Sequence, residues 1–426
     1  MTVKQCKEKK LCIIGLGYVG LPLAVNFSEH LECIGYDQDI ERVNELNLGI
    51  DRTNEVDLKK AHKKNITFTS SKDMLKDCNV FVVTVPTPVD KNKNPDLSHL
   101  ISASKLIAKN LKKMDLVIFE STVYPGATEE VCLPILEESS GFKLNDDFYL
   151  GYSPERVNPG DKIHSLSKIT KVISASNEKA LSIMKGLYSL ITNNNLHEAP
   201  SIIVAEAAKV IENTQRDLNI ALINELAILF NSMNINVSEV LEVASTKWNF
   251  LNFEPGLVGG HCIGVDPYYL TYKAKKVGYE AKLILAGRKI NDGMTDFIIQ
   301  RINFELKERK KTIDKSKILL MGITFKENCP DIRNSKSIEL YEKLTKLGAS
   351  LKVYDPWISD LPIERIKDFN VLKTLGKEKF DVIILTVKHN EFLKINQDTF
   401  HNSLLKNSFI YDIKSCLSIK DNVVTL

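Results

Sequence analysis

The stretch Leu11-Cys12-Ile13-Ile14-Gly15-Leu16-Gly17-Tyr18-Val19-Gly20 decides the fold of the first third of the chain. A short apolar run, typical of a buried strand, leads into a GxGxxG turn, and a helical pattern follows. The next apolar run, 33–36, ends on Asp37. A GxGxxG match alone is weak. Strand, glycine turn, helix, strand and terminal acid in one βαβ unit predict a dinucleotide-binding Rossmann domain.

The glycine turn predicts how a dinucleotide is held. Gly15 permits the turn, Gly17 lets backbone N–H groups approach the pyrophosphate, and Gly20 lets the helix pack on the strand. Tyr18 and Val19 lie in the same turn, where the helix N-terminus supplies partial positive charge for the phosphates. We therefore expect all five residues to contact the cofactor.

The end of the second strand predicts the cofactor's identity. Asp37 would accept hydrogen bonds from the ribose hydroxyls and repel a 2′-phosphate, so we expect NAD rather than NADP. Arg42 follows on a predicted helix. It either stacks near the adenine or is exposed to solvent, and the pattern favours neither.

Further strands are expected at 80–85, 116–120 and before Glu155, with a helix over 97–111 between the first two. This alternation predicts a doubly wound sheet, whose ligands lie beyond the carboxyl ends of the strands. Glu155 is placed at such an end, where a carboxylate is more often functional. The candidates for lining the nicotinamide pocket are Val85, Pro86, Thr87, Ser121 and Thr122. Hydroxyl side chains at such positions also often cap the next helix.

The middle of the chain predicts one long helix. Residues 201–231 contain no Pro or Gly and keep helical periodicity, which gives a helix of roughly 45 Å. Lys209, Asn213 and Arg216 are spaced four and three apart, so they share a face. This face is either a polar stripe toward a ligand or a solvated edge.

A glycine-rich loop, 256–267, holds Cys262 and, four residues later, Asp266. Glycine lets the backbone turn sharply and lie close to a bulky ligand. A thiol presented in this way can attack an electrophilic carbon if its pKa is lowered. The alternative is a small buried hydrophobe in a tight loop.

The last third repeats the αβ pattern without a GxGxxG turn. Strands are expected at 317–322, 351–355, 381–387 and 409–412, and a helix over 335–347. Two cations, Lys326 and Arg333, lie beyond the first of these strands, where they could hold a phosphate or form a plain charged surface. The pattern therefore predicts two Rossmann-like doubly wound domains of the α/β class joined by a long central helix, with boundaries at 1–198, 199–300 and 301–426.

Composition restricts the class of protein. A chain of 426 residues with 43% apolar and 26% charged residues is typical of a globular protein of two or three domains, and the net charge of +3 predicts no nucleic-acid partner. The longest uncharged apolar run, 11–25, is too short to span a bilayer. The eight cysteines show no CxxC spacing, so we expect neither a metal site nor disulfides, and a reducing, cytoplasmic location.

Five motifs in order carry a resemblance. The chain resembles the UDP-glucose/GDP-mannose dehydrogenase family over nearly all its length, and the motifs are the glycine turn, Pro154-Glu155, Lys209 with Asn213, Gly259-Gly260-His261-Cys262 with Asp266, and Phe325-Lys326 with Arg333. Within the family, 246–258 is most similar to the bacterial UDP-N-acetylhexosamine 6-dehydrogenases, which supply uronic acids for capsule, Vi-type or O-antigen polysaccharides. Arg216 also fits that branch.

The resemblance implies a chemistry. The family oxidises the C6 alcohol of the sugar to a carboxylate in two hydride transfers, using two NAD molecules in turn. Cys262 would hold the intermediate as a thiohemiacetal and then a thioester. Lys209 and Asn213 would stabilise the C6 oxyanion, and Asp266 with Lys209 would relay the alcohol proton. Glu155, with Thr122 holding a water, would act as base for thioester hydrolysis, whereas the neighbouring His261 is not assigned as a base.

The resemblance also implies the binding residues and the assembly. Arg333 would face the cofactor, and the chain would form a homodimer or a dimer of dimers through the long helix. The residues expected to contact the UDP-sugar are Glu155, Arg156, Val157, Lys209, Asn213, Arg216, Phe250, Phe253, Gly256, Phe325 and Lys326.

Alternatives remain open at the level of sequence. UDP-glucose or UDP-N-acetylmannosamine could replace UDP-N-acetylglucosamine or UDP-N-acetylgalactosamine as substrate. A β-hydroxyacid-type dehydrogenase, which transfers a single hydride, shares an NAD domain and a helical middle. A scaffold that senses NAD would keep the fold and lose the chemistry, which the intact set of polar residues disfavours.

Overall fold

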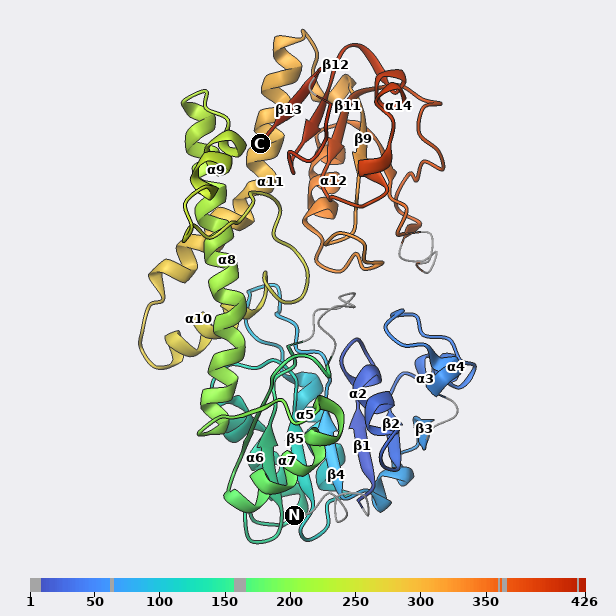
Figure 1. Ribbon diagram of the computed structural model, residues 1–426, viewed down its shortest axis with the longest axis vertical. Helices are drawn as coiled ribbons and strands as arrows, with labels where there is room; N and C mark the ends of the chain where they lie inside the picture. Colours follow the sequence, from blue (N-terminus) through green and yellow to red (C-terminus); the bar gives the residue numbers. More distant parts are fainter. Residues whose placement is uncertain (1–8, 62–64, 157–165, 359–360, 362–365, 420) are drawn as a thin grey trace. The chain divides into compact units, whose positions relative to one another are not determined.

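The chain divides into two compact units, and each is described by itself. The computed structural model describes residues 9–61, 65–156, 166–358, 361, 366–419 and 421–426 (Figure 1). The N-terminal unit comprises residues 1–212 and 268–279, and the C-terminal unit comprises 213–267 and 280–426. The predicted three-domain boundaries stay a prediction.

An eight-stranded sheet forms the centre of the N-terminal unit. Its strand order is β3-β2-β1-β4-β5-β6-β7-β8, and all neighbours are parallel except β6 and β7. Because both faces of such a sheet are covered, its central strands are continuous apolar runs. The strands are β1 Leu11–Ile14, β2 Cys33–Tyr36, β3 Ile66–Thr69, β4 Val80–Val83, β5 Leu116–Phe119, β6 Tyr149–Tyr152, β7 Lys171–Ala175 and β8 Leu196–Glu198.

Helices cover this sheet on both faces. Helix α2 packs against α7, and α5 packs against α6. Since right-handed crossovers run in opposite directions from β1 and from β4, the two pairs lie on opposite faces. The bounds are α2 Gly20–Phe27, α3 Ile40–Asn47, α4 Leu58–Ala61, η1 Lys72–Asp77, α5 Ser98–Ala108, η2 Thr128–Cys132, α6 Leu133–Ser140 and α7 Glu178–Thr192.

The C-terminal unit is built on a five-stranded parallel sheet of order β10-β9-β11-β12-β13. Alternate residues of β9 point to opposite faces: Ile318 and Leu320 pack in one apolar cluster, and Leu319 and Met321 in another. The strands are β9 Lys317–Met321, β10 Ser350–Tyr354, β11 Phe380–Leu385, β12 Leu404–Asp412 and β13 Val423–Thr425.

The remaining helices include α8, the longest helix of the described residues. Helix α8 spans Ile202–Ser232 and passes from one unit into the other, and α10, Asp266–Lys276, does the same. The others in the C-terminal unit are α9 Val237–Ser245, α11 Lys282–Glu308, η3 Ile313–Lys315, α12 Lys336–Lys346, η4 Phe392–Lys394 and α14 Gln397–Asn402. None of the described helices is long and apolar enough to cross a bilayer.

The predicted fold class, two Rossmann-like doubly wound α/β domains with a long central helix, is confirmed. The predicted helices 201–231 and 335–347 correspond within a residue to α8 and α12. Ser335 caps α12 by accepting the N–H of Ser337. The sequence reasoning missed β3, β7, β8 and β13, which are short strands on or near the sheet edges.

The same kind of glycine turn follows the first strand of each sheet. Gly15 and Gly322 follow their first strands with φ of +97° and +90°. Thr84 donates its hydroxyl hydrogen bond to Gly15 O at 2.8 Å, and Thr386 bonds to Gly322 O in the same way. In both units, a threonine directly after the strand that pairs with the first strand, β4 or β11, thus closes the glycine turn.

Candidate active site

The three glycines of the first turn are required for different reasons. A Cβ on Gly20 would lie 1.8 Å from Gly15 O, and one on Gly15 would lie 3.1 Å from Thr84 O. Both are therefore fixed by packing within the protein. Gly17 is exposed, and a Cβ there would meet nothing within 4 Å. Its lack of a side chain instead leaves room for a ligand to approach the backbone. Tyr18 and Val19 are half-buried beside it.

Asp37 is held at the edge of this turn. Its Oδ2 accepts the N–H of Leu16 at 2.8 Å, and its Oδ1 accepts the N–H of Asp39 at 3.0 Å. Each carboxylate oxygen keeps a second lone pair. Asp37 follows β2 immediately, so an oriented carboxylate stands beside the open backbone at Gly17, and the two together fit a dinucleotide.

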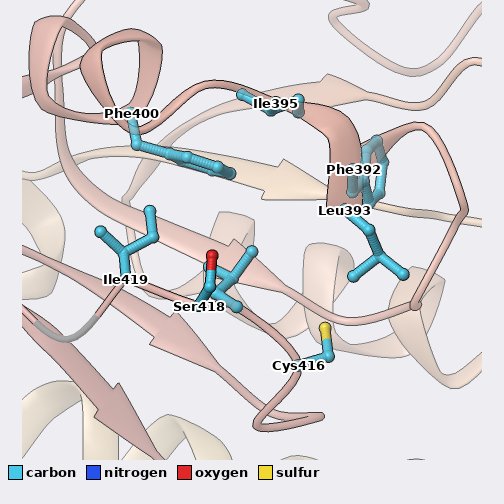
Figure 2. A pocket seen from close by; sticks show the side chains of 8 residues that line it. Phe392, Leu393, Ile395, Phe400, Cys416, Ser418 and Ile419 are labelled. Atoms are coloured by element: carbon cyan, nitrogen blue, oxygen red, sulfur yellow. The ribbon is translucent and has the colours of Figure 1, made fainter.

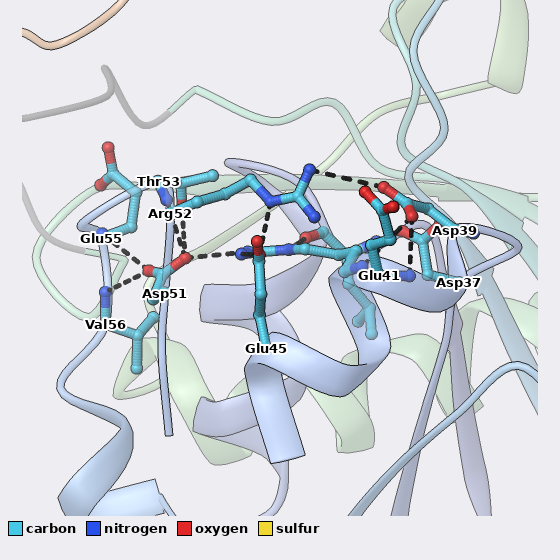
Figure 3. Close-up of polar contacts among 11 residues, drawn as sticks. Asp37, Asp39, Glu41, Glu45, Asp51, Arg52, Thr53, Glu55 and Val56 are labelled. Atoms are coloured by element: carbon cyan, nitrogen blue, oxygen red, sulfur yellow. Dashed lines mark hydrogen bonds and ion pairs between the residues drawn. The ribbon is translucent and has the colours of Figure 1, made fainter. Parts of the chain in front are cut away.

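Arg42 has a role that the sequence did not predict. Its guanidinium is buried, donates from Nε to Leu16 O at 2.9 Å, and donates from Nη2 to Asp51 at 2.8 Å. Asp51 also accepts hydrogen bonds from Thr53, Glu55 and Val56 (Figure 3). Solvent exposure is therefore wrong for this side chain, and a contact with adenine stays a prediction. Burial would raise the pKa of Asp51, but hydrogen bonds from Thr53 and Arg42 outweigh it and lower that pKa. Arg42 therefore stabilises the glycine turn through its hydrogen bond to the Leu16 carbonyl.

The loops that follow β4 and β5 are tied together. Thr87 donates its hydroxyl to Thr122 O at 2.6 Å, and Ser121 donates to Val85 O at 2.6 Å. Tyr269 donates to Thr87 O from the start of α10. The pocket-lining residues predicted at these strand ends are thus adjacent, and the hydroxyls of Thr87 and Ser121 are used to shape the loops. Pro86 is exposed in the first loop.

Glu155 belongs to a buried cluster that the sequence reasoning missed. Lys171 Nζ lies 3.1 Å from Glu155 Oε2 and 2.6 Å from Glu120 Oε2. Tyr188 donates its hydroxyl to the other oxygen of Glu120. The only signal in the sequence was a lysine opening an apolar run, because β7 itself went unrecognised.

The side chain of Arg156, the residue after Glu155, pairs with helix α8 rather than with the buried cluster. Arg156 is exposed and pairs through Nη2 with Glu212 Oε1 at 2.7 Å. Its backbone N–H donates to Glu155 Oε1 at 2.7 Å. The predicted substrate contact Val157 lies outside the described residues.

Helix α8 carries the predicted polar stripe. Asn213 Nδ2 donates to Asp266 Oδ2 at 2.6 Å, and both side chains are buried. Lys209 lies one turn earlier on the same face and is half-buried, whereas Arg216 is exposed. At Asn213 the polar face of α8 is therefore buried rather than solvated, because its amide bonds to Asp266, the first residue of α10.

The loop around Cys262 is pressed against the C-terminal sheet. Gly260 has φ of +83° and donates its N–H to Asn334 O at 3.0 Å, and a Cβ on it would lie 2.5 Å from the Phe325 ring. Only glycine fits so close an approach with this φ. The carbonyl of Cys262 accepts the N–H of Asp266 at 2.8 Å, so the half-exposed thiol residue leads directly into α10.

The predicted substrate loop is anchored by a second missed residue. Asn224 accepts the N–H of Gly256 at 2.8 Å and donates to Gly256 O at 3.0 Å. Its amide also donates to Asn291 on α11. Phe250 and Phe253 are half-buried in the same loop. One buried amide on α8 therefore fixes both backbone groups of a loop residue.

The cations beyond β9 differ in their partners. Arg333 makes a forked contact with Asp331, whose Oδ2 also lies 4.0 Å from His261 Nδ1. The His261 ring meets Phe325 edge-on at 5.3 Å. Lys326 Nζ lies 5.5 Å from the centre of the Phe325 ring. His261 thus faces Phe325 and Asp331.

A cavity of about 210 Å³ lies elsewhere in the C-terminal unit (Figure 2). It is lined by Phe392, Leu393, Ile395, Phe400, Cys416, Leu417, Ser418 and Ile419. None of these is a predicted site residue. Among the described residues, no three His, Cys, Asp or Glu side chains come together as a metal site would need.

The sequence is similar to known nucleotide-sugar dehydrogenases over nearly its whole length. Residues 9–192 match the NAD binding domain of the UDP-glucose/GDP-mannose dehydrogenase family, 203–293 its central domain and 319–419 its UDP binding domain. The chain is 50% identical to a UDP-N-acetyl-D-glucosamine 6-dehydrogenase of Pseudomonas aeruginosa, covering 96% of this chain and 98% of the relative. It is 45% identical to one of Salmonella typhi, covering 98% and 99%.

A solved structure agrees over the same length. The UDP-N-acetylmannosamine dehydrogenase of Pyrococcus horikoshii superposes with a TM-score of 0.88 at 30% identity, covering 98% of each chain. The oriented Asp37, the open Gly17 and the cysteine loop on a second α/β sheet define an NAD-dependent dehydrogenase that acts on nucleotide sugars. The chain belongs to the UDP-glucose/GDP-mannose dehydrogenase family.

Proposed function

We propose that this enzyme oxidises C6 of a UDP-N-acetylhexosamine, UDP-N-acetylglucosamine first, to the uronate through a covalent intermediate on Cys262. The overall reaction consumes one sugar alcohol, two NAD and one water, and gives one carboxylate, two NADH and three protons. The observation that carries the proposal is the identity of 45–50% to UDP-N-acetyl-D-glucosamine 6-dehydrogenases over nearly the whole chain.

The first half of the reaction uses the residues around the thiol. The glycine turn and Asp37 would hold NAD, which would supply the acceptor for the hydride of C6. Asp266 and Lys209 relay the alcohol proton, and the Cys262 thiolate adds to the aldehyde carbon. The hydrogen bond between Asn213 and Asp266 supports this assignment, because it fixes the carboxylate and the amide in one arrangement. Lys209 and Asn213 offset the charge that develops on the C6 oxygen.

The second half releases the product. Loss of a second hydride converts the thiohemiacetal to a thioester. Water, positioned by Thr122, then attacks the carbonyl carbon while Glu155 takes its proton. The C–S bond breaks and the thiolate of Cys262 leaves. The orientation of Glu155 by Lys171 and by the N–H of Arg156 supports the role of base.

Sequence separates the substrates better than shape does. Relatives called UDP-N-acetyl-D-mannosamine dehydrogenases are 31–34% identical to this chain, against 45–50% for the glucosamine enzymes. A solved NDP-N-acetyl-D-galactosaminuronic acid dehydrogenase of Methanosarcina mazei shares the fold with a TM-score of 0.82 at 27% identity. UDP-N-acetylglucosamine is therefore the first choice, and its C4 epimer the second.

The test measures rate and stoichiometry together. Initial rates with UDP-N-acetylglucosamine, UDP-N-acetylgalactosamine, UDP-N-acetylmannosamine and UDP-glucose should be highest for the first or second. Each sugar should yield two NADH. One NADH per sugar would contradict the proposal and favour a dehydrogenase that transfers a single hydride.

Two variants test the covalent step. Cys262→Ala should form no uronate. Cys262→Ser should accumulate an ester, visible as a mass increase equal to the nucleotide-sugar acyl group. Two NADH per sugar in Cys262→Ala would rule out the covalent route, and an unmodified mass in Cys262→Ser after prolonged turnover would count against it.

We further infer that the active form is a homodimer or a dimer of dimers, in the cytoplasm, supplying uronate for a surface polysaccharide. Large apolar side chains on helices of the C-terminal unit are exposed, and a second copy would bury them; they include Leu222, Leu229, Val243, Leu283 and Phe304. The seven described cysteines are free thiols, as a reducing compartment would keep them.

A further inference from the structure

A fully buried lysine lies between two carboxylates beside the sheet of the N-terminal unit. Lys171 opens β7, Glu120 follows β5 directly, and Glu155 follows β6 by three residues. Tyr188 reaches the cluster from α7. The side chains of Lys171 and Glu120 are 0% exposed, whereas that of Glu155 is 11% exposed. Only one of the two carboxylates therefore reaches solvent.

The hydrogen bonds of the ammonium group are complete. An ammonium has three N–H donors, and Lys171 Nζ has three acceptors: Glu120 Oε2 at 2.6 Å, Glu155 Oε2 at 3.1 Å and Pro154 O at 3.3 Å. Its position is fixed from three sides. Burial would lower the pKa of Lys171, but the charges of Glu120 and Glu155 outweigh it and raise that pKa. The group is therefore charged at neutral pH.

The two carboxylates have different surroundings. Lys171 and the Tyr188 hydroxyl occupy one oxygen each of Glu120, which is walled off from solvent. Glu155 takes Lys171 on one oxygen and the N–H of Arg156 on the other. Glu120 thus has the geometry of a fixed counter-ion, and Glu155 is the carboxylate that solvent can reach.

We propose that Lys171 and Glu120 are positioning residues for the hydrolytic half of the reaction: they hold Glu155 in one orientation and set its strength as a base. This inference rests on the proposed role of Glu155. The ammonium of Lys171 lies against one oxygen of Glu155, and Glu120, with the shorter contact, shares that ammonium so that it is not bound by Glu155 alone. Neither residue touches the substrate.

Two substitutions should move the pH profile of hydrolysis in opposite directions. Lys171→Met leaves two facing carboxylates without a cation, so the pKa of Glu155 rises and the acidic limb moves to higher pH. Glu120→Gln leaves the ammonium to Glu155 alone, so the limb moves to lower pH and the maximal rate falls. Each shift should be about one unit or more. Two other groups interact with Glu155. Tyr188 from α7 donates its hydroxyl to Glu120 and interacts electrostatically with Glu155. Arg156 donates its backbone N–H to Glu155 and is itself paired with Glu212 from α8.

The experiment follows thioester hydrolysis separately from hydride transfer. Full-length enzyme is mixed with UDP-N-acetylglucosamine and NAD, and the NADH burst and the mass of the acylated enzyme are recorded between pH 6 and 10. In Lys171→Met we expect two NADH per chain in the burst, then turnover slowed at least 10-fold at neutral pH, with acyl-enzyme accumulating. Lys171→Arg should recover part of the rate because it restores the cation.

Controls separate the possible failures. Lys185→Met removes a lysine from an exposed pair with Glu198 in the same unit and should leave the profile unchanged. If Lys171→Met does not fold, the double variant Lys171→Met/Glu120→Met removes both buried charges and should show an acidic limb between the two single shifts. Glu155→Gln tests the proposed base itself, because no acyl-enzyme in that variant would refute the proposed function. Acyl-enzyme in Glu155→Gln, with limbs in the Lys171 and Glu120 variants that stay together or move the same way, would overturn this inference alone.

Discussion

At the scale of single residues, the glycine turn separates what the protein needs from what the ligand needs. Gly20 has no room for a Cβ, since one would lie 1.8 Å from Gly15 O. Gly17 has room, because nothing lies within 4 Å of the same added atom. The GxGxxG pattern revealed the turn, and the coordinates show which glycine serves which purpose.

We therefore expect two Gly→Ala changes to fail differently. Gly17→Ala should leave the melting temperature within about 1 °C, because surface changes are nearly neutral, and should weaken NAD binding at least tenfold. Gly20→Ala should lower the melting temperature by several degrees, because it forces backbone atoms apart. Thermal melts with NAD titrations distinguish them, and tight NAD binding by Gly17→Ala would contradict this division.

Asp37 governs cofactor choice at the same scale. Its two oxygens are oriented by the N–H groups of Leu16 and Asp39. Asp37→Ser removes the negative charge that repels a 2′-phosphate, so the ratio of kcat/KM for NADP to that for NAD should rise by about 10-fold or more. Steady-state rates with both cofactors measure it, and an unchanged ratio would place the discrimination elsewhere.

At the scale of elements, α8 gains its position from buried polar contacts as well as apolar packing. Glu206 accepts the N–H groups of Gly126 and Thr128 at the start of η2, and Asn224 holds Gly256. Periodicity predicted the length of α8 because its pattern is local. It could not identify Glu206 or Asn224, whose partners lie 80 and 32 residues away in sequence.

Glu206 should make stability depend on pH. Burial raises its pKa from 4.5 to about 7. The folded state therefore binds a proton that the unfolded state has lost between these values, and the free energy of unfolding falls as pH rises from 4.5 to 7. The loss is at most about 3 kcal/mol. Urea unfolding at pH 5 and pH 8 should show a smaller pH difference in Glu206→Gln than in the wild type, and equal differences would contradict this assignment.

Asn224 should link stability to substrate binding. Asn224→Ala removes both hydrogen bonds to Gly256 and leaves its buried backbone groups without them, at a cost of about 2–4 kcal/mol. We expect KM for the UDP-sugar to rise more than kcat falls, because the loop that contains Phe250 and Phe253 loses its anchor. Asn219→Ala, at a half-buried position of the same helix where the amide donates to Gln215 O within α8, is the matched control. A fall in kcat alone would contradict the role.

At the scale of the whole molecule, the order of elements was predictable and the fine placement of side chains was not. Buried parallel strands are continuous apolar runs, so most of both sheets could be predicted from the sequence. Short strands such as β8, which has three residues, carry too little pattern. The motifs named the candidate site residues, Cys262 and Asp266 among them, and their roles stay predictions. Lys171 was missed because its partners come from three other elements.

Assembly is the remaining prediction at this scale. Leu222 and Leu229 are exposed and seven residues apart on α8, so they share a face. The double variant Leu222→Glu/Leu229→Glu should convert the oligomer to monomers in light scattering. The matched double variant Lys105→Glu/Lys109→Glu, at two exposed residues on α5 and at its C-cap, should not. A wild-type monomer would contradict the proposal outright.

The duplicated glycine turn limits how the enzyme can use its oxidant. In the second copy, Asp355 already accepts N–H groups of Ile323, Thr324 and Trp357, and His389 lies 3.3 Å from it. That carboxylate serves its own loop, and no GxGxxG follows Gly322 in the sequence. Because the second turn lacks the GxGxxG pattern, we expect one chain to bind one nicotinamide coenzyme at a time. A calorimetric titration with NAD should saturate at one equivalent per chain. The partly oxidised sugar must then stay bound while NADH leaves and a second NAD binds.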